Sequence, residues 1–305
     1  MAALIPAVLV DASIYLFRAW HAWPERLDRD GQPVHALHGF LAFLAELIER
    51  THPRHLALAF DADPDGGFRR RIDPRYKAHR PPTPPALLRQ RELAREAAGL
   101  LGLRTLAIAD FEADDLIGSA SAVFAREGLP SLLISADKDL GQLLGPCDRL
   151  WDFDRQRPFG PEGVRERFGV EPAQIADYLA LAGDASDNIR GVPGIGARTA
   201  ARLLQAFGDL ERLLAELPAL ARLSMRGARR LPDVLNAHRA ELMRNRLLTA
   251  IRRDAPVPTE ASAYRPRSGD TVGLEAFAER HSLPHRLLLR LIAAIERGTG
   301  PLSGP

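Results

Sequence analysis

The chain has 305 residues, of which 46% are hydrophobic and 26% are charged, and its formal net charge is +2. These values are ordinary for a soluble globular protein. The only cysteine, Cys147, excludes a disulfide framework and a thiolate metal site, and no run of about 18 apolar residues is present to span a membrane. No basic segment precedes the short apolar N-terminus, so we expect no signal peptide and a cytoplasmic protein.

Apolar segments alternate with amphipathic ones through the first half of the chain. We predict strands within 7–13, 55–63, 104–115 (passing from strand into helix), 129–139 and 149–153, and helices within 34–50 and 86–102. Strands this apolar, alternating with helices, indicate an α/β fold with a parallel sheet covered on both faces.

The second half changes character at about residue 161. From there the pattern predicts helices only, within 161–168, 172–183, 197–207 and 209–217. A stretch rich in proline and small residues, 255–269, precedes a last predicted helix at 272–297. We therefore expect three parts: a sheet core at 1–160, a helical domain at 161–255, and a C-terminal segment at 256–305.

Acidic residues recur where the predicted strands end. The candidates are Asp11 and Asp61 after the first two strands, Glu112, Asp114 and Asp115 after the third, Asp137 and Asp139 after the fourth, and Asp184 and Asp187 on one face of a predicted helix end. Ligands of open α/β sheets bind outside the carboxyl ends of the strands, so we expect these side chains to meet in one crevice. A simpler reading covers only part of the set: Glu112 and Asp114 are also good helix-capping residues.

So many carboxylates in one crevice repel each other. Two unit charges about 5 Å apart cost roughly 3 kcal/mol at an effective dielectric constant near 20. Divalent cations relieve this repulsion, and all-oxygen ligation without cysteine favours Mg²⁺ or Mn²⁺. Two such ions are the usual device for in-line attack on a phosphodiester.

A basic segment, 66–80, follows the second predicted strand. It contains aromatic residues suited to stacking on splayed bases, and several cationic residues, of which Arg70, Arg71, Arg75 and Arg80, together with Tyr76, are candidate DNA contacts. The alternative interpretation is a solvated basic loop.

The glycine hairpin, residues 191–200, does not have the spacing of a dinucleotide fingerprint or a P-loop. We predict a hairpin between two helices, whose backbone approaches a phosphate. Its candidate DNA contacts are Arg190, Gly191, Val192, Gly194, Ile195, Gly196, Arg198 and Thr199, and Arg202, Arg226, Arg229 and Arg230 extend the basic track. A helix–turn–helix packing corner remains the alternative.

Taken together, these motifs have a familiar order. The segments at 10–22, 60–63, 112–118, 135–143, 179–200 and 224–230 resemble the 5′ nuclease domain at the N-terminus of bacterial DNA polymerase I, in the flap endonuclease and 5′–3′ exonuclease family. The match extends over about residues 5–250. No polymerase sequence follows, so a free-standing member is the expectation.

The resemblance implies an α/β fold with a parallel-sheet, PIN-like nuclease core, an arch segment at about 66–90, and a helix–hairpin–helix motif in the helical domain. It implies that all nine acids hold two Mg²⁺ or Mn²⁺ ions and that the hairpin holds K⁺. Catalysis is expected to involve Asp11, Asp61, Asp115, Asp137 and Asp139, with Arg69 and Lys77 as phosphate clamps.

The implied function is cleavage of DNA at 5′ flaps, nicks and 5′ ends without sequence specificity, in replication or repair. We expect a monomer with no membrane contact and a functional partnership with a DNA polymerase. Two alternatives remain open: a catalytically weak protein that binds DNA junctions, and a PIN-type ribonuclease.

Overall fold

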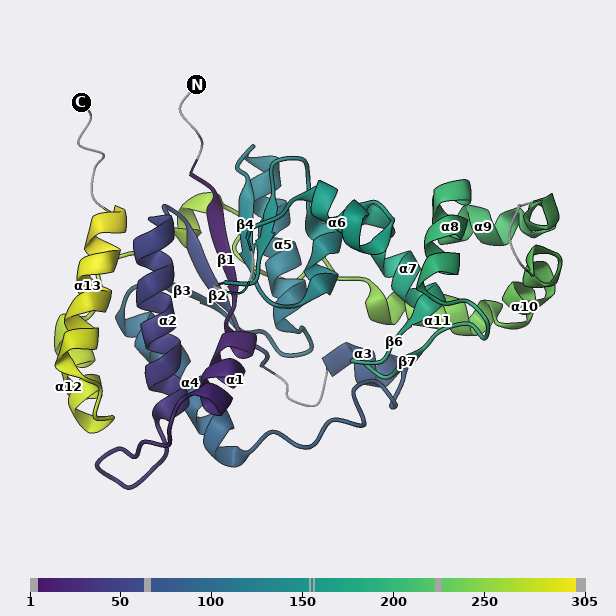
Figure 1. The fold of residues 1–305 in the computed structure, drawn as a ribbon. Helices are drawn as coiled ribbons and strands as arrows, with labels where there is room; N and C mark the ends of the chain where they lie inside the picture. Colours follow the sequence, from purple (N-terminus) through teal and green to yellow (C-terminus); the bar gives the residue numbers. More distant parts are fainter. Residues whose placement is uncertain (1–4, 63–66, 154, 156, 223–226, 300–305) are drawn as a thin grey trace.

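The computed structural model describes residues 5–62, 67–153, 155, 157–222 and 227–299. Five parallel strands form the central sheet in the order β3-β2-β1-β4-β5 (Figure 1). Their bounds are Ala7–Asp11 for β1, Leu56–Ala59 for β2, Arg104–Leu106 for β3, Ser131–Ile134 for β4 and Arg149–Trp151 for β5. The predicted parallel α/β sheet is confirmed, and each strand is shorter than its apolar segment.

Alternating side chains of the strands enter two separate cores. In β1, Leu9 packs with α5 on one face, whereas Val8 and Val10 pack with α2 on the other. All five residues of β1 are buried, because helices cover both faces of a parallel sheet. The helices in the first part of the chain are α1 (Ala12–Ala22), α2 (His35–Thr51), α3 (Gly67–Ile72), α4 (Pro85–Leu100) and α5 (Ala113–Arg126).

The sheet places the predicted acidic positions at one edge. Asp11 is the last residue of β1, and Asp61 and Asp137 follow β2 and β4 by two or three residues. Strand order reverses between β1 and β4, and such a switch point is where open α/β sheets bind their ligands. These three acids therefore lie at the carboxyl ends of neighbouring strands, as their positions in the sequence predict.

The helical domain extends away from the sheet (Figure 1). Its helices are α6 (Pro161–Phe168), α7 (Ile175–Ala182), α8 (Ala197–Phe207), α9 (Leu210–Ala215), α10 (Leu231–Ala237) and α11 (Arg239–Thr249), with 3₁₀ turns at Pro172–Gln174, Leu217–Arg222 and Ala228–Arg230. Two further 3₁₀ turns lie outside this domain, at Lys138–Leu143 after β4 and at Ala261–Tyr264 in the C-terminal segment.

The expectation of helices only after residue 161 is wrong at one place. Strands β6 (Gly183–Asp184) and β7 (Ile189–Arg190) form an antiparallel pair between α7 and α8, which we call the acidic hairpin (residues 183–190). Gly183 has φ +83° and ends α7. A Cβ at Gly191 would lie 2.3 Å from the carbonyl carbon of Ala182, so the chain approaches itself too closely for any side chain there.

The C-terminal segment holds two helices where the sequence pattern predicts one. Helix α12 (Thr271–Arg280) and α13 (His285–Thr299) are separated at Ser282, whose φ is +53°, and at Pro284, which cannot continue a helix. Helix α13 lies along α2 (Figure 1), and Arg290 pairs with Glu49 there at 2.6 Å. Among the described residues, no helix combines the length and apolar character needed to cross a membrane.

Candidate active site at the carboxyl edge of the sheet

Three acids at the strand ends are held by hydrogen bonds from neighbouring groups. Asp11 accepts from the Ile14 amide at 3.2 Å and from the Ser135 hydroxyl at 2.9 Å. Asp61 accepts from the Ala113 amide at 2.9 Å, which connects β2 to the start of α5. Asp137 accepts from the Asp139 amide at 2.8 Å. These bonds fix the carboxylates before any ligand arrives.

The acids lie close enough to perturb each other. Burial and then the charge of Asp61 raise the pKa of Asp11 to about 7. Burial, followed by Asp137 and Asp184, raises the pKa of Asp139 to about 8. Burial, together with Asp137 and Asp11, also raises the pKa of Asp114 well above its ordinary value. Asp137 contributes to all three shifts, so it is close enough to repel each of these acids.

We predict that Asp139→Asn stabilises the protein in EDTA, and that the gain grows as pH rises from about 4 to about 8. A carboxyl whose pKa is raised on folding binds its proton more tightly in the folded state, so stability is lost as pH rises towards the folded pKa of about 8. Asparagine carries no charge and removes this loss. Urea unfolding of both proteins near pH 5 and near pH 8 measures the difference.

The control for this prediction is Asp254→Asn, which removes an exposed carboxylate paired with Arg252. That pair lowers the pKa of Asp254, so its replacement gives no stabilisation at any pH in the window. If Asp139→Asn raises the free energy of unfolding by the same amount at both pH values, the proposed repulsion is contradicted.

At the start of α5, the acids divide into two roles. Glu112 and Asp115 form a capping box, each accepting from the backbone amide of the other. Capping therefore explains Glu112 and Asp115 rather than Glu112 and Asp114. Asp114 is left directed towards the repulsive group, where Asp137 and Asp11 raise its pKa.

Asp115 is fully buried, and both of its oxygens are saturated. Oδ1 accepts from Arg69 Nη2 at 2.8 Å and from the Arg252 amide at 2.9 Å, and Oδ2 accepts from Arg69 Nη1 at 2.6 Å and from the Glu112 amide at 3.1 Å. A carboxylate has about four acceptor positions, and all are used here. The predicted role of Asp115 as a metal ligand would therefore require one of these donors to move away.

Arg69, on α3, is likewise engaged within the protein. Its side chain is only 3% exposed, and besides Asp115 it donates to the carbonyl oxygens of Leu248 at 2.9 Å and Ala250 at 3.0 Å. It joins α3, α5 and the end of α11. A guanidinium buried in this way is not available to clamp a phosphate.

The acidic hairpin brings two further carboxylates to this edge. Asp184 and Asp187 were expected on a helix end, but Asp184 lies on β6 and Asp187 in the turn that follows. Lys138 approaches Asp184 at 3.4 Å, while Lys77 lies 3.0 Å from Glu112 and 3.9 Å from Asp187. The two lysines therefore neutralise part of the charge from opposite sides.

The remaining basic-segment residues are mostly paired in the protein itself. Arg71 pairs with Asp110 at 2.5 Å, Arg75 with Asp73 at 2.8 Å, and Arg80 with Asp187 at 2.8 Å; all three arginines are exposed. Only the Arg71–Asp110 pair is exposed on both sides, so it costs little to exchange for a phosphate partner, whereas Asp73 and Asp187 are largely buried.

Two further members of the basic segment have intramolecular partners. Half-buried Arg70 donates to the Tyr76 carbonyl at 3.2 Å. Tyr76 is 2% exposed and donates to Glu112 or Asp187, so in this arrangement its ring is not open to a base. The ring packs with Ile189 and Leu248.

The glycine hairpin exposes Gly194, Gly196 and Arg198, with Arg190 exposed just before it. Val192 and Ile195 are 4% and 3% exposed and belong to the main hydrophobic core, so their side chains are not DNA contacts. Half-buried Gly191 and Thr199 flank the exposed turn, and Arg229 and Arg230 are exposed further along, whereas Arg226 lies outside the described residues.

The acid set matches a divalent cation in its donor chemistry. Asp139 Oδ1 is buried without a hydrogen-bond partner, and the pKa values of Asp11 and Asp139 are raised by burial and neighbouring carboxylates. Within the described ranges, no three acid, histidine or cysteine side chains are already gathered as a metal-binding group. The residues fit the cation chemically, but their side chains are not arranged around a common point.

Three residues of this edge were missed by sequence reasoning. Ser13 accepts from the Asp61 amide at 2.9 Å, Ser135 donates to Asp11, and Lys138 approaches Asp184. Ser135 and Lys138 lie within two residues of predicted acids. This proximity in the sequence is the signal that could have identified them as part of the site.

Two family models match the chain. One, described as the 5′–3′ exonuclease N-terminal resolvase-like domain, matches residues 6–169, and the other, described as the 5′–3′ exonuclease C-terminal SAM fold, matches residues 170–271. DNA polymerase I of Bacillus caldotenax is 35% identical over 291 residues, which are 91% of this chain and 32% of that protein. The chain thus spans about a third of the length of that relative.

Solved structures share the fold at lower identity. The bacteriophage T5 flap endonuclease, in a complex with DNA and metal ions, has a TM-score of 0.64 and 22% identity, covering 95% of this chain and 99% of that chain. The catalytic core of Rad2 with DNA substrate has a TM-score of 0.62 and 15% identity, covering 96% and 92%. Both likenesses extend over the sheet and the helical domain together.

Proposed function

The chain belongs to the 5′–3′ exonuclease family, and from this premise we propose that it is a nuclease that hydrolyses DNA phosphodiesters at 5′ ends and 5′ flaps. The observation that carries the proposal is the convergence of Asp11, Asp61, Asp114 and Asp137 on one edge of the sheet. A cluster with so much unrelieved repulsion costs stability, and it is retained where it binds cations.

We assign the binding of divalent cations to eight acids, since Asp115 has no acceptor position left. They are Asp11, Asp61, Glu112, Asp114, Asp137, Asp139, Asp184 and Asp187. Two Mg²⁺ or Mn²⁺ ions bound there would supply charge stabilisation for in-line attack of water on the phosphodiester. The products of the proposed reaction are a 5′-phosphate and a 3′-hydroxyl.

Lys77 is the cation of the protein best placed to act on the reacting phosphate. Burial lowers the pKa of its amine, but the charges of Glu112, Asp187 and Asp61 raise this pKa by more than burial lowers it. The ammonium therefore stays charged at every working pH. Its Nζ lies beside the carboxylates that would hold the cations. We assign to it the stabilisation of negative charge that develops on the phosphate oxygens.

Cleavage of a 5′-flap duplex, labelled at each end in turn, tests this function with Mg²⁺, with Mn²⁺ and with EDTA. We expect cleavage near the flap junction with either metal and none in EDTA. Tight binding without cleavage in all conditions would favour the alternative of a junction-binding protein. Cleavage of single-stranded RNA but not of the DNA flap would favour the PIN-type ribonuclease.

The glycine hairpin is proposed to bind the duplex backbone without reading sequence, since backbone amides and arginines directed at phosphate carry no base information. We predict that Gly194→Val weakens binding to every duplex by a similar factor. Gly194 has φ +81° with no atom within 4 Å of an added Cβ, so the substitution acts through backbone strain and not through a clash. Titration with flap duplexes of unrelated sequence measures the loss.

Gly31→Val is the matched control. Gly31 has φ +72° with equally open surroundings, but it lies in the loop before α2. It should show the same strain and unchanged DNA affinity. Repeating the titrations in potassium and in lithium buffer tests whether the hairpin also holds K⁺; an affinity lost for only one sequence would contradict the phosphate-binding role.

A further inference from the structure

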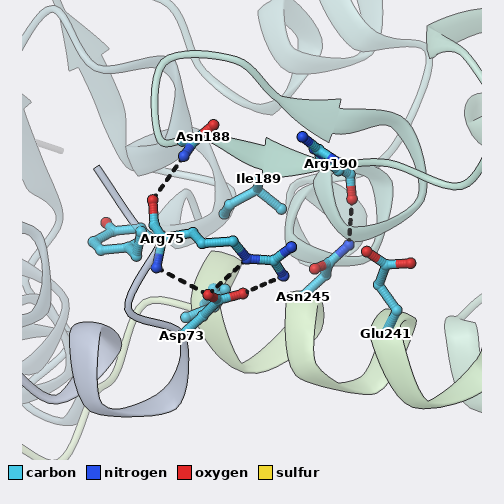
Figure 2. A pocket seen from close by; sticks show the side chains of 9 residues that line it. Asp73, Arg75, Asn188, Ile189, Arg190, Glu241 and Asn245 are labelled. Atoms are coloured by element: carbon cyan, nitrogen blue, oxygen red, sulfur yellow. Dashed lines mark hydrogen bonds and ion pairs between the residues drawn. The ribbon is translucent and has the colours of Figure 1, made fainter. Parts of the chain in front are cut away.

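The basic segment, the acidic hairpin and α11 meet at one junction, shown in Figure 2. They enclose a small cavity of about 40 Å³, lined in part by Asp73, Arg75, Asn188, Arg190 and Asn245. The residues that line it come from three chain segments, and Arg75 and Asn188, on two of them, are 113 positions apart. The junction therefore connects the arch segment to the helical domain.

Asn188 makes one of the side-chain hydrogen bonds that join the two loops. Its Nδ2 donates to the Arg75 carbonyl oxygen at 2.8 Å (Figure 2). Next to it, the Lys77 amide donates to the Asp187 carbonyl at 3.0 Å, and Arg80 donates to the Ser186 carbonyl at 3.0 Å. Residues 75–80 are thus paired with residues 186–188 largely through main-chain oxygens.

Two residues at this contact have left-handed backbone conformations. Lys77 has φ +52° and Asn188 has φ +59°. Asparagine adopts this region readily, but a long side chain such as lysine does so at a cost in free energy. Strained residues of this kind persist only where surrounding contacts hold them. The contact with the acidic hairpin is the constraint that holds Lys77.

The acidic hairpin is itself anchored from its other side. Asn245 on α11 is 3% exposed and donates to the carbonyl oxygen of Arg190 at 2.7 Å (Figure 2). It also donates to the carbonyl oxygen of Ala180 at 3.2 Å. The hairpin is therefore fixed to α7 and α11. The bond from Asn188 to Arg75 connects the arch segment to this anchored hairpin.

From these contacts we infer that Asn188 is a positioning residue, which holds the Arg75–Lys77 backbone so that the Lys77 ammonium lies between Glu112 and Asp187. The inference rests on the proposed function, because it explains how the lysine of that site is placed. Asn188 itself touches neither substrate nor the reacting atoms. It is exposed, so its replacement does not disturb the core.

Two substitutions separate the bond from the backbone conformation. Asn188→Gly allows φ +59° and removes the amide, and Asn188→Asp keeps the size of the side chain but presents an acceptor to the Arg75 carbonyl. Both should speed hydrogen exchange of the Lys77 amide in the DNA-free protein roughly tenfold, the equivalent of one lost hydrogen bond. His52→Gly, at another left-handed residue (φ 42°), is the control for changes in backbone freedom.

The second measurement compares the rate of cleavage with the affinity for DNA. Single-turnover cleavage of a 5′-flap duplex in Mg²⁺ should slow about tenfold or more in both Asn188 variants, because a small misplacement of a catalytic group is costly. The dissociation constant for the same duplex should stay unchanged. A residue with only a structural role would lower thermal stability without this difference between rate and affinity.

The outcomes are distinguishable. Asn188→Asp with normal Lys77 exchange and normal cleavage overturns the inference, as does a parallel loss of affinity and rate. If the unmodified protein does not cleave, the proposed function fails, and the exchange measurement still decides whether Asn188 holds Lys77. Faster exchange and slower cleavage at constant affinity support the inference.

Discussion

Asp115→Asn should lower the free energy of unfolding by about 3–5 kcal/mol, because it removes the bidentate counter-ion of a buried guanidinium and leaves only Glu112, at 3.4 Å, to oppose its charge. Arg69 is 3% exposed and Asp115 is fully buried, so water cannot replace the lost partner. Asparagine also offers an amide group where four donors meet. Urea unfolding in EDTA measures the loss independently of any cation.

The neighbouring acid provides a control with the opposite sign. Asp114→Asn removes a carboxylate whose pKa is raised by burial and by Asp137 and Asp11, so it should stabilise the cation-free protein. If Asp115 were a cation ligand in the same repulsive group, its replacement would also stabilise. Equal stabilisation by the two substitutions would therefore contradict the structural role of Asp115.

A double variant separates the charge pair from its packing. Arg69→Met with Asp115→Leu should recover much of the stability lost in Asp115→Asn, since apolar residues of similar volume often replace a buried pair without cost. Asp110→Asn, at the exposed Arg71–Asp110 pair, should change stability by less than about 1 kcal/mol.

Asp137→Asn should reduce the rate of flap cleavage by roughly a thousandfold or more at saturating Mg²⁺, equivalent to about 4 kcal/mol of lost transition-state stabilisation. Asp137 is the acid that perturbs Asp11, Asp114 and Asp139 together, so it lies where the proposed cations would bind. DNA affinity should be kept or improved, because the substitution removes negative charge from a site that binds a polyanion.

Asp254→Asn removes an equal charge at the surface and should leave cleavage unchanged. Single-turnover rates and dissociation constants for one flap duplex, measured in the same buffer, give both quantities. Normal turnover of Asp137→Asn would refute the assignment of cations to this edge of the sheet. Loss of rate and affinity in proportion would instead indicate that Asp137 acts by holding the DNA-binding surface.

The sequence predicted those parts of the site that follow from local pattern. Apolar strands separated by helices indicate a parallel sheet, and in such a sheet every strand ends at the same edge. Asp11, Asp61 and Asp137 could therefore be placed together from their position after a strand. The exposed glycines of the hairpin at 191–200 could be recognised for the same reason, because their spacing is local.

Tertiary structure alone decided which partner each charged or polar side chain takes. Arg69 donates to the Leu248 carbonyl, 179 residues away, and Asn188 to the Arg75 carbonyl, 113 residues away. No spacing rule in the sequence predicts such contacts. In the structure Asp115 and Arg69 form a buried ion pair, and Tyr76 is buried. The sequence thus determined where the charge gathers, and the packing of distant backbone determined which of these charges remain available for chemistry.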